Sequence, residues 1–146
     1  MRERMNVAEV APDAYRAVLG LEKYVHANLD RTLYYLVKMR ASVINGCAFC
    51  VDMHSQDAEQ AGESVRRLFA VSTWREAPFF TERERAALAL TDEVTRLGEH
   101  GVSDEVWDTA AKHFAEKELA DLLVAIATIN VWNRIAVSTH KQPMDV

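Results

Sequence analysis

The chain has 146 residues, of which 49% are hydrophobic and 27% are charged, and its formal net charge is −5. This length and composition predict one globular domain over residues 1–146, which buries a core without disulfide or metal cross-links. The 17 Lys and Arg residues are scattered along an acidic chain, which does not resemble the basic footprint of a nucleic-acid-binding protein.

The sequence shows no targeting or membrane segment. The first fifteen residues, MRERMNVAEVAPDAY, lack the apolar core of a secretory signal. The longest apolar run, LLVAIATI at 122–129, is too short to cross a bilayer. We therefore expect a cytoplasmic protein that is not bound to a membrane.

The first two predicted helices occupy residues 12–27 and 31–44. The first segment opens with a Pro-Asp pair, which suits a helix start, and its apolar residues recur at helical spacing. Asp30 is a suitable N-cap for the second segment. Asn45-Gly46 then forms a typical helix end.

Five further helical segments are predicted, and they cover 47–62, 63–71, 81–97, 103–114 and 117–138. A loop is expected at 72–80, and the sequence TERE that follows it has the spacing of a capping box. The last helix is apolar over much of its circumference, which predicts a central core helix or an oligomer interface. Because no segment alternates with period two, the expected fold class is all-α, with about six to seven helices.

The sequence CAFCVDMH at 47–54 contains the residues that carry chemistry. On a helix that begins near residue 47, Cys47, Cys50 and His54 share one face. Thiols in a first helical turn lie near unpaired N–H groups and the positive end of the helix dipole, which favour the thiolate. The imidazole can accept a thiol proton, and the two sulfurs can close a disulfide. We therefore predict a redox pair, with these three residues as the catalytic group.

Two other interpretations of these residues stay open. The thiols could be small core residues packed beside a core histidine. They could also join His54 as ligands of a zinc ion. The fourth zinc ligand would then be a carboxylate or one of the other four histidines, His26, His100, His113 and His140. The redox interpretation requires no metal and no cofactor, and we predict none.

A family resemblance is centred on the same residues. INGCAFCVDMH at 44–54 and LVKMRAS at 36–42 resemble the core motif of the AhpD-like alkylhydroperoxidases of the carboxymuconolactone decarboxylase superfamily. TERERAALALTDEV at 81–94 and ATINVWNRIAV at 127–137 extend the resemblance to roughly residues 15–140. It implies an AhpD-like helical bundle with the CxxC at the N-terminus of the third helix, assembled as a homo-oligomer, commonly a trimer or hexamer.

The resemblance also implies a function and a role for each residue. Members of the family reduce a peroxide substrate with the CxxC pair, and a dithiol reductant, either a lipoyl domain or a thioredoxin-like protein, returns the electrons. By resemblance, Cys50 attacks the peroxide, Cys47 resolves the product and meets the reductant, and His54 joins a proton relay. The helix dipole alone would instead favour Cys47 as the more acidic thiol.

One residue of the family pattern is missing. The relay begins with a glutamate twelve positions before the first cysteine, and this chain has Tyr35 there. A carboxylate can accept a proton near neutral pH, whereas a phenol with a pKa of about 10 can form a hydrogen bond but is a poor base. Tyr35 is therefore either an auxiliary hydrogen-bonding residue or a core aromatic.

These observations lead to three hypotheses. The first is a thiol-dependent peroxidase. The second is a disulfide reductase or thiol-exchange protein with weak or no peroxidase activity, which the missing glutamate motivates. The third is a non-catalytic helical oligomer that senses oxidants or binds a ligand. A decarboxylase activity is not favoured, because that branch of the superfamily does not depend on a CxxC and no motif singles out a Lys or Arg for an acidic lactone.

Overall fold

The computed structural model describes residues 1–144, and these residues form helices and no strand. The helices follow in the order α1 (Val7–Val10), α2 (Pro12–Asn28), α3 (Arg31–Ile44), α4 (Ala48–Gln60), α5 (Val65–Ala70), the 3₁₀ helix η1 (Val71–Thr73), α6 (Glu82–Thr95), α7 (Asp104–His113) and α8 (Glu116–Thr139). The predicted all-α fold class is confirmed.

The observed helices match the predicted segments to within a few residues, with two additions. α1 is a single turn capped by Asn6, and its presence makes the CxxC helix, α4, the fourth in chain order rather than the third. The 3₁₀ turn η1 extends from the end of α5 into the segment that was expected to be a loop. Both are too short to carry the repeating apolar stripe from which a helix is predicted.

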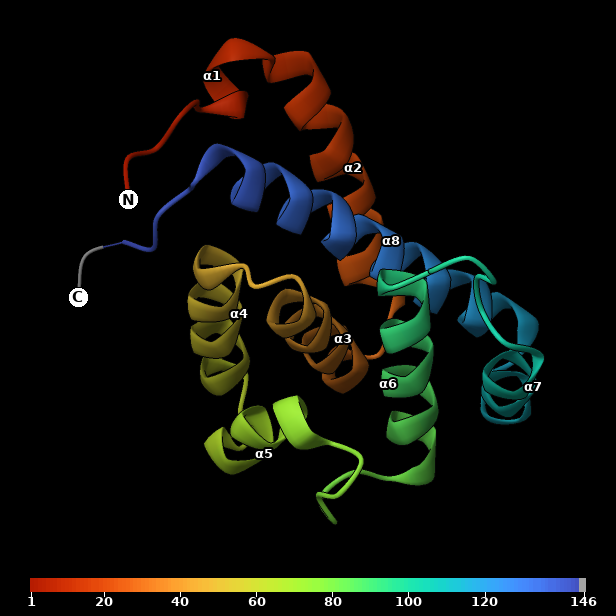
Figure 1. The fold of residues 1–146 in the computed structure, drawn as a ribbon. Helices are drawn as coiled ribbons and strands as arrows, with labels where there is room; N and C mark the ends of the chain where they lie inside the picture. The colour runs from red at the N-terminus through yellow and green to blue at the C-terminus, as the bar shows by residue number, and fades with distance from the viewer. Residues whose placement is uncertain (145–146) are drawn as a thin grey trace.

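Helix α8 lies at the centre of the bundle (Figure 1). It packs against α2 on one side and against α3, α4 and α6 on the other. By length and composition alone α8 could span a membrane, since an 18-residue window of it has a mean hydropathy of 1.4. In the fold, however, Leu122, Ile126 and Ile129 are completely buried in a core shared with α3 and α6. The apolar circumference of α8 is therefore explained in large part by its central position.

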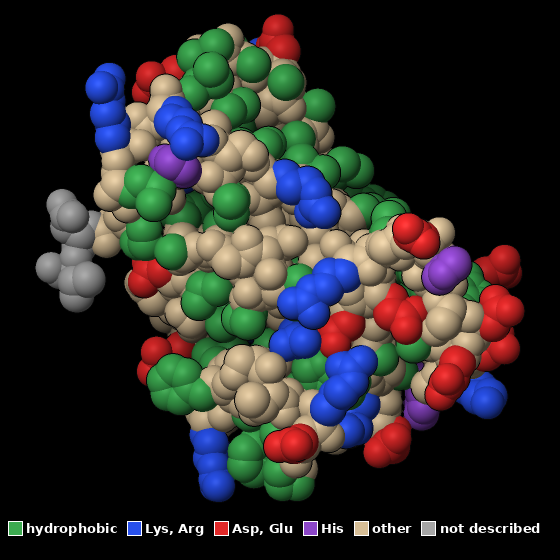
Figure 2. Space-filling model, viewed as in Figure 1, with side chains coloured by type: hydrophobic (Ala, Val, Ile, Leu, Met, Phe, Trp, Pro, Cys, Tyr) green, Lys and Arg blue, Asp and Glu red, His purple; other side chains and the backbone are tan. Residues whose placement is uncertain are grey.

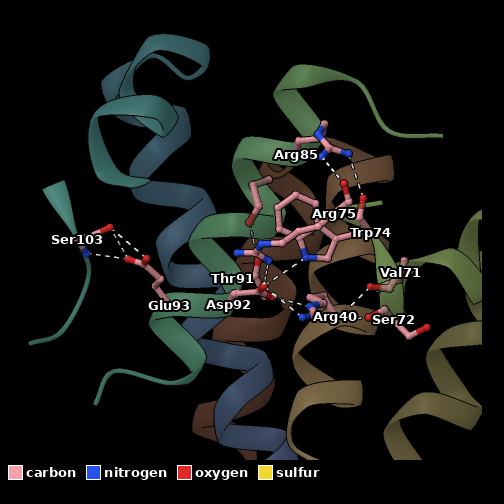
Figure 3. Close-up of polar contacts among 11 residues, drawn as sticks. Arg40, Val71, Ser72, Trp74, Arg75, Arg85, Thr91, Asp92, Glu93 and Ser103 are labelled. Atoms are coloured by element: carbon pink, nitrogen blue, oxygen red, sulfur yellow. Dashed lines mark hydrogen bonds and ion pairs between the residues drawn. The ribbon is translucent and has the colours of Figure 1, made fainter. Parts of the chain in front are cut away.

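A polar cluster around Asp92 joins α3, η1 and α6 (Figure 3). The Asp92 carboxylate accepts hydrogen bonds from Arg40 on α3 and from Arg75 and Trp74, which follow η1. Burial acts to raise the pKa of Asp92, but these hydrogen bonds and the charges of the two arginines more than offset it, and the pKa lies below its ordinary value. The cluster fixes α6 against α3, the helix that leads into the CxxC.

Candidate redox site

The turn between α3 and α4 positions the two cysteines. Asn45 and Gly46 end α3, and Gly46 takes a left-handed conformation, with φ of +65°, that favours glycine. Cys47 is then the N-cap of α4: its sulfur accepts a hydrogen bond from the Cys50 N–H at 3.3 Å. The predicted helix start is confirmed, and it places both cysteines at the first turn.

Buried polar side chains hold this turn against α8. The Asn45 amide donates hydrogen bonds to the side-chain oxygens of Asn130 and Asn133, both at 2.9 Å. Asn133 is completely buried and in turn donates to the Ser42 hydroxyl at 3.0 Å. Because every bond joins α3 or its end to the central helix, the start of α4 has a fixed position in the bundle.

Cys47 and Cys50 form a disulfide, and their Cα atoms are 5.2 Å apart. Both residues are 98% buried, and they pack with Ala136 of α8 and with Phe49. A disulfide between residues three apart in a helical turn is a two-electron redox centre, because each sulfur can leave as a thiolate when the other is attacked.

Cys50 opens into a cavity of about 250 Å³ between α2, α3, α4 and α8. Most of the wall is apolar or aromatic and includes Leu19, Phe49, Trp132 and Ile135. His54 lies one helical turn after Cys50 and lines the same cavity. The cavity therefore brings a sulfur and an imidazole together in an apolar space large enough for a small molecule.

His54 is buried and lacks a hydrogen-bond partner on one nitrogen. The side chain is 95% buried, and its Nε2 atom has no partner among the described residues. Burial, followed by the charge of Lys38, lowers the pKa of His54 to about 3, against the opposing effect of Glu22. At neutral pH the imidazole is therefore uncharged, and Nε2 can donate or accept one hydrogen bond according to the tautomer.

A buried ion pair forms the polar part of the cavity wall. Lys38 of α3 is 97% buried, lines the cavity and pairs with the carboxylate of Glu22 from α2. The same carboxylate accepts hydrogen bonds from the Tyr34 hydroxyl and, at 3.1 Å, from the Trp132 indole N–H. Burial lowers the pKa of Lys38, although the charge of Glu22 opposes this change. The pair therefore contributes little net charge to the cavity wall.

Glu22 is ionised in this arrangement. Burial acts to raise the pKa of its carboxyl, but the charge of Lys38 and the three hydrogen bonds more than offset this effect, and the pKa lies below its ordinary value. Burial raises the pKa of the Tyr34 hydroxyl, and the same carboxylate raises it further. Tyr34 is therefore a hydrogen-bond donor and not a source of protons.

The structure brings together Cys47, Cys50 and His54 but does not bring Tyr35 to the cavity. Tyr35 packs against the hydrophobic cluster that contains Leu36 and Met39, and its ring contacts that of Tyr34 edge-on. Glu22 and Lys38, the charged pair in the cavity wall, were not predicted from the sequence. No local pattern singles them out, because they lie on different helices and α3 has other inward-facing polar residues, Arg40 and Ser42.

The alternative of a zinc site is not supported by the side chains present. Among residues 1–144, no three His, Cys, Asp or Glu side chains form a group that could hold a metal ion. His26 instead packs edge-on against the Tyr34 ring, and His140 caps the end of α8. The donor set that tetrahedral zinc requires is therefore missing from the described part of the chain.

The chain is similar to proteins of one family along most of its length. The sequence profile of the carboxymuconolactone decarboxylase family matches residues 12–93. The chain is 37% identical over 139 residues to the uncharacterized protein YdfG of Bacillus subtilis, and the alignment covers 94% of this chain and 95% of that protein. The family match therefore extends well beyond the CxxC segment, from the start of α2 to near the end of α6.

Solved structures share the fold. A protein of unknown function from Agrobacterium tumefaciens, for which a role as the antioxidant defence protein AhpD has been put forward, superposes with a TM-score of 0.96 at 43% identity. The match covers 99% of this chain and all of that one. The debrominase Bmp8 superposes with a TM-score of 0.81 at 24% identity, over 91% of this chain and 72% of that one, and at this identity it shows the fold alone.

Proposed function

Because this chain belongs to the carboxymuconolactone decarboxylase family, as an AhpD-like member, we propose that it reduces peroxides through a dithiol–disulfide cycle of Cys47 and Cys50. The observation that carries the proposal is the opening of Cys50, together with His54, into an apolar cavity. A peroxide in that cavity would meet a sulfur, a neutral imidazole and a buried charge pair.

The reaction begins with the reduced pair. The Cys50 sulfur attacks the terminal oxygen of a hydroperoxide, the O–O bond breaks, and the product alcohol leaves with the proton of the Cys50 thiol. Cys50 then carries a sulfenic acid. The Cys47 thiol attacks this sulfur, water leaves, and the observed disulfide forms. A dithiol returns two electrons by thiol–disulfide exchange and regenerates both thiols.

His54 is the residue best placed to move the proton. It is neutral at physiological pH, and its Nε2 has no partner among residues 1–144. A neutral imidazole can accept the thiol proton on one nitrogen while it donates from the other, or pass the same proton to the leaving oxygen. Lys38 adds a positive charge in the same cavity wall, where negative charge develops as the O–O bond breaks.

Peroxide consumption under single turnover tests this proposal. Reduced wild type, Cys50→Ser, Cys47→Ser and His54→Asn proteins are mixed with cumene hydroperoxide or hydrogen peroxide. We expect Cys50→Ser to be inactive, Cys47→Ser to stop at the sulfenic acid, and His54→Asn to react about a hundredfold more slowly. A wild-type rate no higher than that of the Cys47→Ser/Cys50→Ser double variant would refute the proposal.

A second candidate is dithiol exchange without peroxide turnover. The position of Tyr35 favours it, because this side chain lies in the hydrophobic cluster and supplies no base to the cavity. A protein that reduces a small disulfide substrate at the same rate with or without His54, and leaves peroxides intact, would support this candidate. Redox chemistry of the cysteine pair is common to both functions.

A further inference from the structure

The two cysteines of the disulfide line different hollows. Cys50 lines the cavity with His54, whereas Cys47 lines a separate hollow at the start of α4 and the end of α8. Ala136 and Lys141 line both spaces, so the wall between them is thin. A molecule that approaches Cys47 therefore does not need to enter the cavity in which the peroxide would bind.

The hollow at Cys47 is bordered by basic side chains. His140 and Lys141 line it, and no Asp or Glu is among the residues that do. His140 also lines an adjoining hollow with Arg2, Arg4 and a single acid, Glu3. Figure 2 shows Lys or Arg side chains and a histidine gathered where the start of the chain meets the end of α8.

This basic surface is held in place by hydrogen bonds, and three of its cationic side chains form no salt bridge among the described residues. The backbone N–H of Arg4 donates a hydrogen bond to the Thr139 carbonyl at 2.8 Å, and the Arg4 guanidinium donates one to the Ser138 carbonyl. These two hydrogen bonds hold the start of the chain against α8. Lys141 lies over the Phe49 ring at 4.5 Å, next to the disulfide. Within residues 1–144 no salt bridge involves Arg2, Arg4 or Lys141. The surface is notable in a chain whose net charge is −5.

We propose that this basic surface, formed by Arg2, Arg4, His140 and Lys141, is the docking site of the reductant, and that the reductant is a dithiol protein with acidic residues around its thiols. The proposal rests on the redox cycle proposed above and adds the surface and the charge of the partner. Electrostatic complementarity of this kind mainly accelerates encounter and selects partners.

The exchange itself balances without a further reactant. One reductant thiolate attacks the Cys47 sulfur, the Cys47–Cys50 bond breaks, and Cys50 leaves as a thiolate that takes up a proton. The second reductant thiol then attacks the mixed disulfide and releases Cys47. The protein gains two electrons, and the reductant becomes a disulfide. Peroxide and reductant would therefore reach the two sulfurs through different hollows.

The test uses three synthetic peptides that carry a dihydrolipoyl-lysine flanked by Glu, Gln or Lys residues. The rate at which each peptide reduces the protein disulfide is measured by rapid alkylation of the released thiols. At 10 mM salt we expect the Glu peptide to react about tenfold faster than the Lys peptide. At 1 M salt, where the Debye length falls to about 3 Å, the difference should vanish.

Two matched double variants locate the effect. Arg2→Gln/Arg4→Gln should lose most of the difference between the three peptides. Arg66→Gln/Arg96→Gln changes two exposed arginines elsewhere and, with the same change in net charge, should keep the wild-type preference. Dithiothreitol, which has no charged flanking residues, should reduce both variants at the wild-type rate, and this checks that the disulfide environment is intact.

Equal rates with the Glu and Lys peptides in wild type, or loss of the preference in Arg66→Gln/Arg96→Gln, would overturn the docking proposal. Peroxide turnover driven by dithiothreitol, which has no charged flanking residues, is measured on the same proteins. A protein that turns over peroxide without charge selectivity would refute the docking site alone. A protein that shows charge-selective disulfide reduction without peroxide turnover would refute the peroxidase function alone.

Discussion

At the scale of single residues, the buried neutral imidazole of His54 makes the stability of the protein depend on pH. Its pKa in the folded protein is about 3, against about 6.5 in the unfolded chain. Between these values the unfolded state binds a proton that the folded state does not, so acidification favours unfolding. We expect the free energy of unfolding to fall by about 2 kcal/mol between pH 6.5 and 4.5. Urea denaturation of the oxidised protein at several pH values measures this.

A substitution identifies the source of this loss. His54→Asn should remove most of the decline between pH 6.5 and 4.5, whereas His26→Asn, at an exposed position, should leave it unchanged. The lowered pKa values of Glu22 and Asp92 also cost stability in acid, but only below the ordinary carboxyl range of about 4. If wild type and His54→Asn lose stability in parallel over this interval, the histidine is not buried as described.

The Glu22–Lys38 ion pair leads to a second prediction at this scale, which concerns the free energy of unfolding. Glu22→Gln leaves the Lys38 ammonium buried without a counter-ion. We expect a loss of roughly 2–3 kcal/mol in the free energy of unfolding, below the full range for a buried pair because Glu22 is partly exposed. Lys38→Met should cost less, because an apolar side chain replaces the buried charge. In the double variant the two losses should not add, and a double-mutant cycle measures the difference. Additive losses would show that the two side chains do not interact.

At the scale of helices, Asp92 and Glu93 are neighbours in α6 with different roles (Figure 3). Asp92 accepts hydrogen bonds from three side chains that bring η1 and α3 against α6, whereas Glu93 accepts from Ser103 at an exposed position. We expect Asp92→Asn to lower the free energy of unfolding by about 3 kcal/mol and Glu93→Gln by about 0.5 kcal/mol. Thermal and urea unfolding of the two variants compare them, and similar losses would contradict the role of the cluster.

The helices could be predicted from the sequence because their signals are local. Thr81 and Glu84 form the predicted capping box, and Asn45-Gly46 ends α3 where its turn residues indicate. A cap acts over three residues and a helical stripe over one or two turns, so each can be read within a short segment. Helix α1 was missed because it is one turn long and buries no residue.

The carboxylate of the site could not be predicted in this way. Glu22 meets Lys38 and Trp132, which are 16 and 110 residues away along the chain. No periodicity links positions on three different helices, and the family pattern directed attention to Tyr35 instead. Cys47, Cys50 and His54 were accessible to sequence reasoning because all three lie within two turns of one helix.

At the scale of the whole molecule, an exposed apolar stripe runs along α2. Ala14, Ala17, Leu21 and Tyr24 are all exposed and recur at spacings of three and four residues, the pattern of a helix–helix seam. The exposed Val10 of α1 precedes this stripe. Figure 2 shows hydrophobic side chains gathered over these two helices. A continuous apolar face of this kind indicates a protein contact. We therefore expect α2 to pack against a second copy of the chain.

This assembly is tested by light scattering after size-exclusion chromatography. Wild type should have a mass that is a multiple of the 16.5 kDa chain. Leu21→Glu places a charge in the middle of the stripe and should shift the mass toward one chain, because an unpaired carboxylate in an apolar contact costs several kcal/mol. Phe69→Glu changes a more exposed hydrophobic residue, 77% accessible on α5, and should leave the mass unchanged.

Because Leu19 of α2 lines the cavity at Cys50, dissociation of the α2 contact should also make that cavity more open. Alkylation of the reduced Cys50 thiol by iodoacetamide should then be several-fold faster in Leu21→Glu than in wild type. A wild-type monomer would refute the assembly, and dissociation by Phe69→Glu alone would place the contact elsewhere.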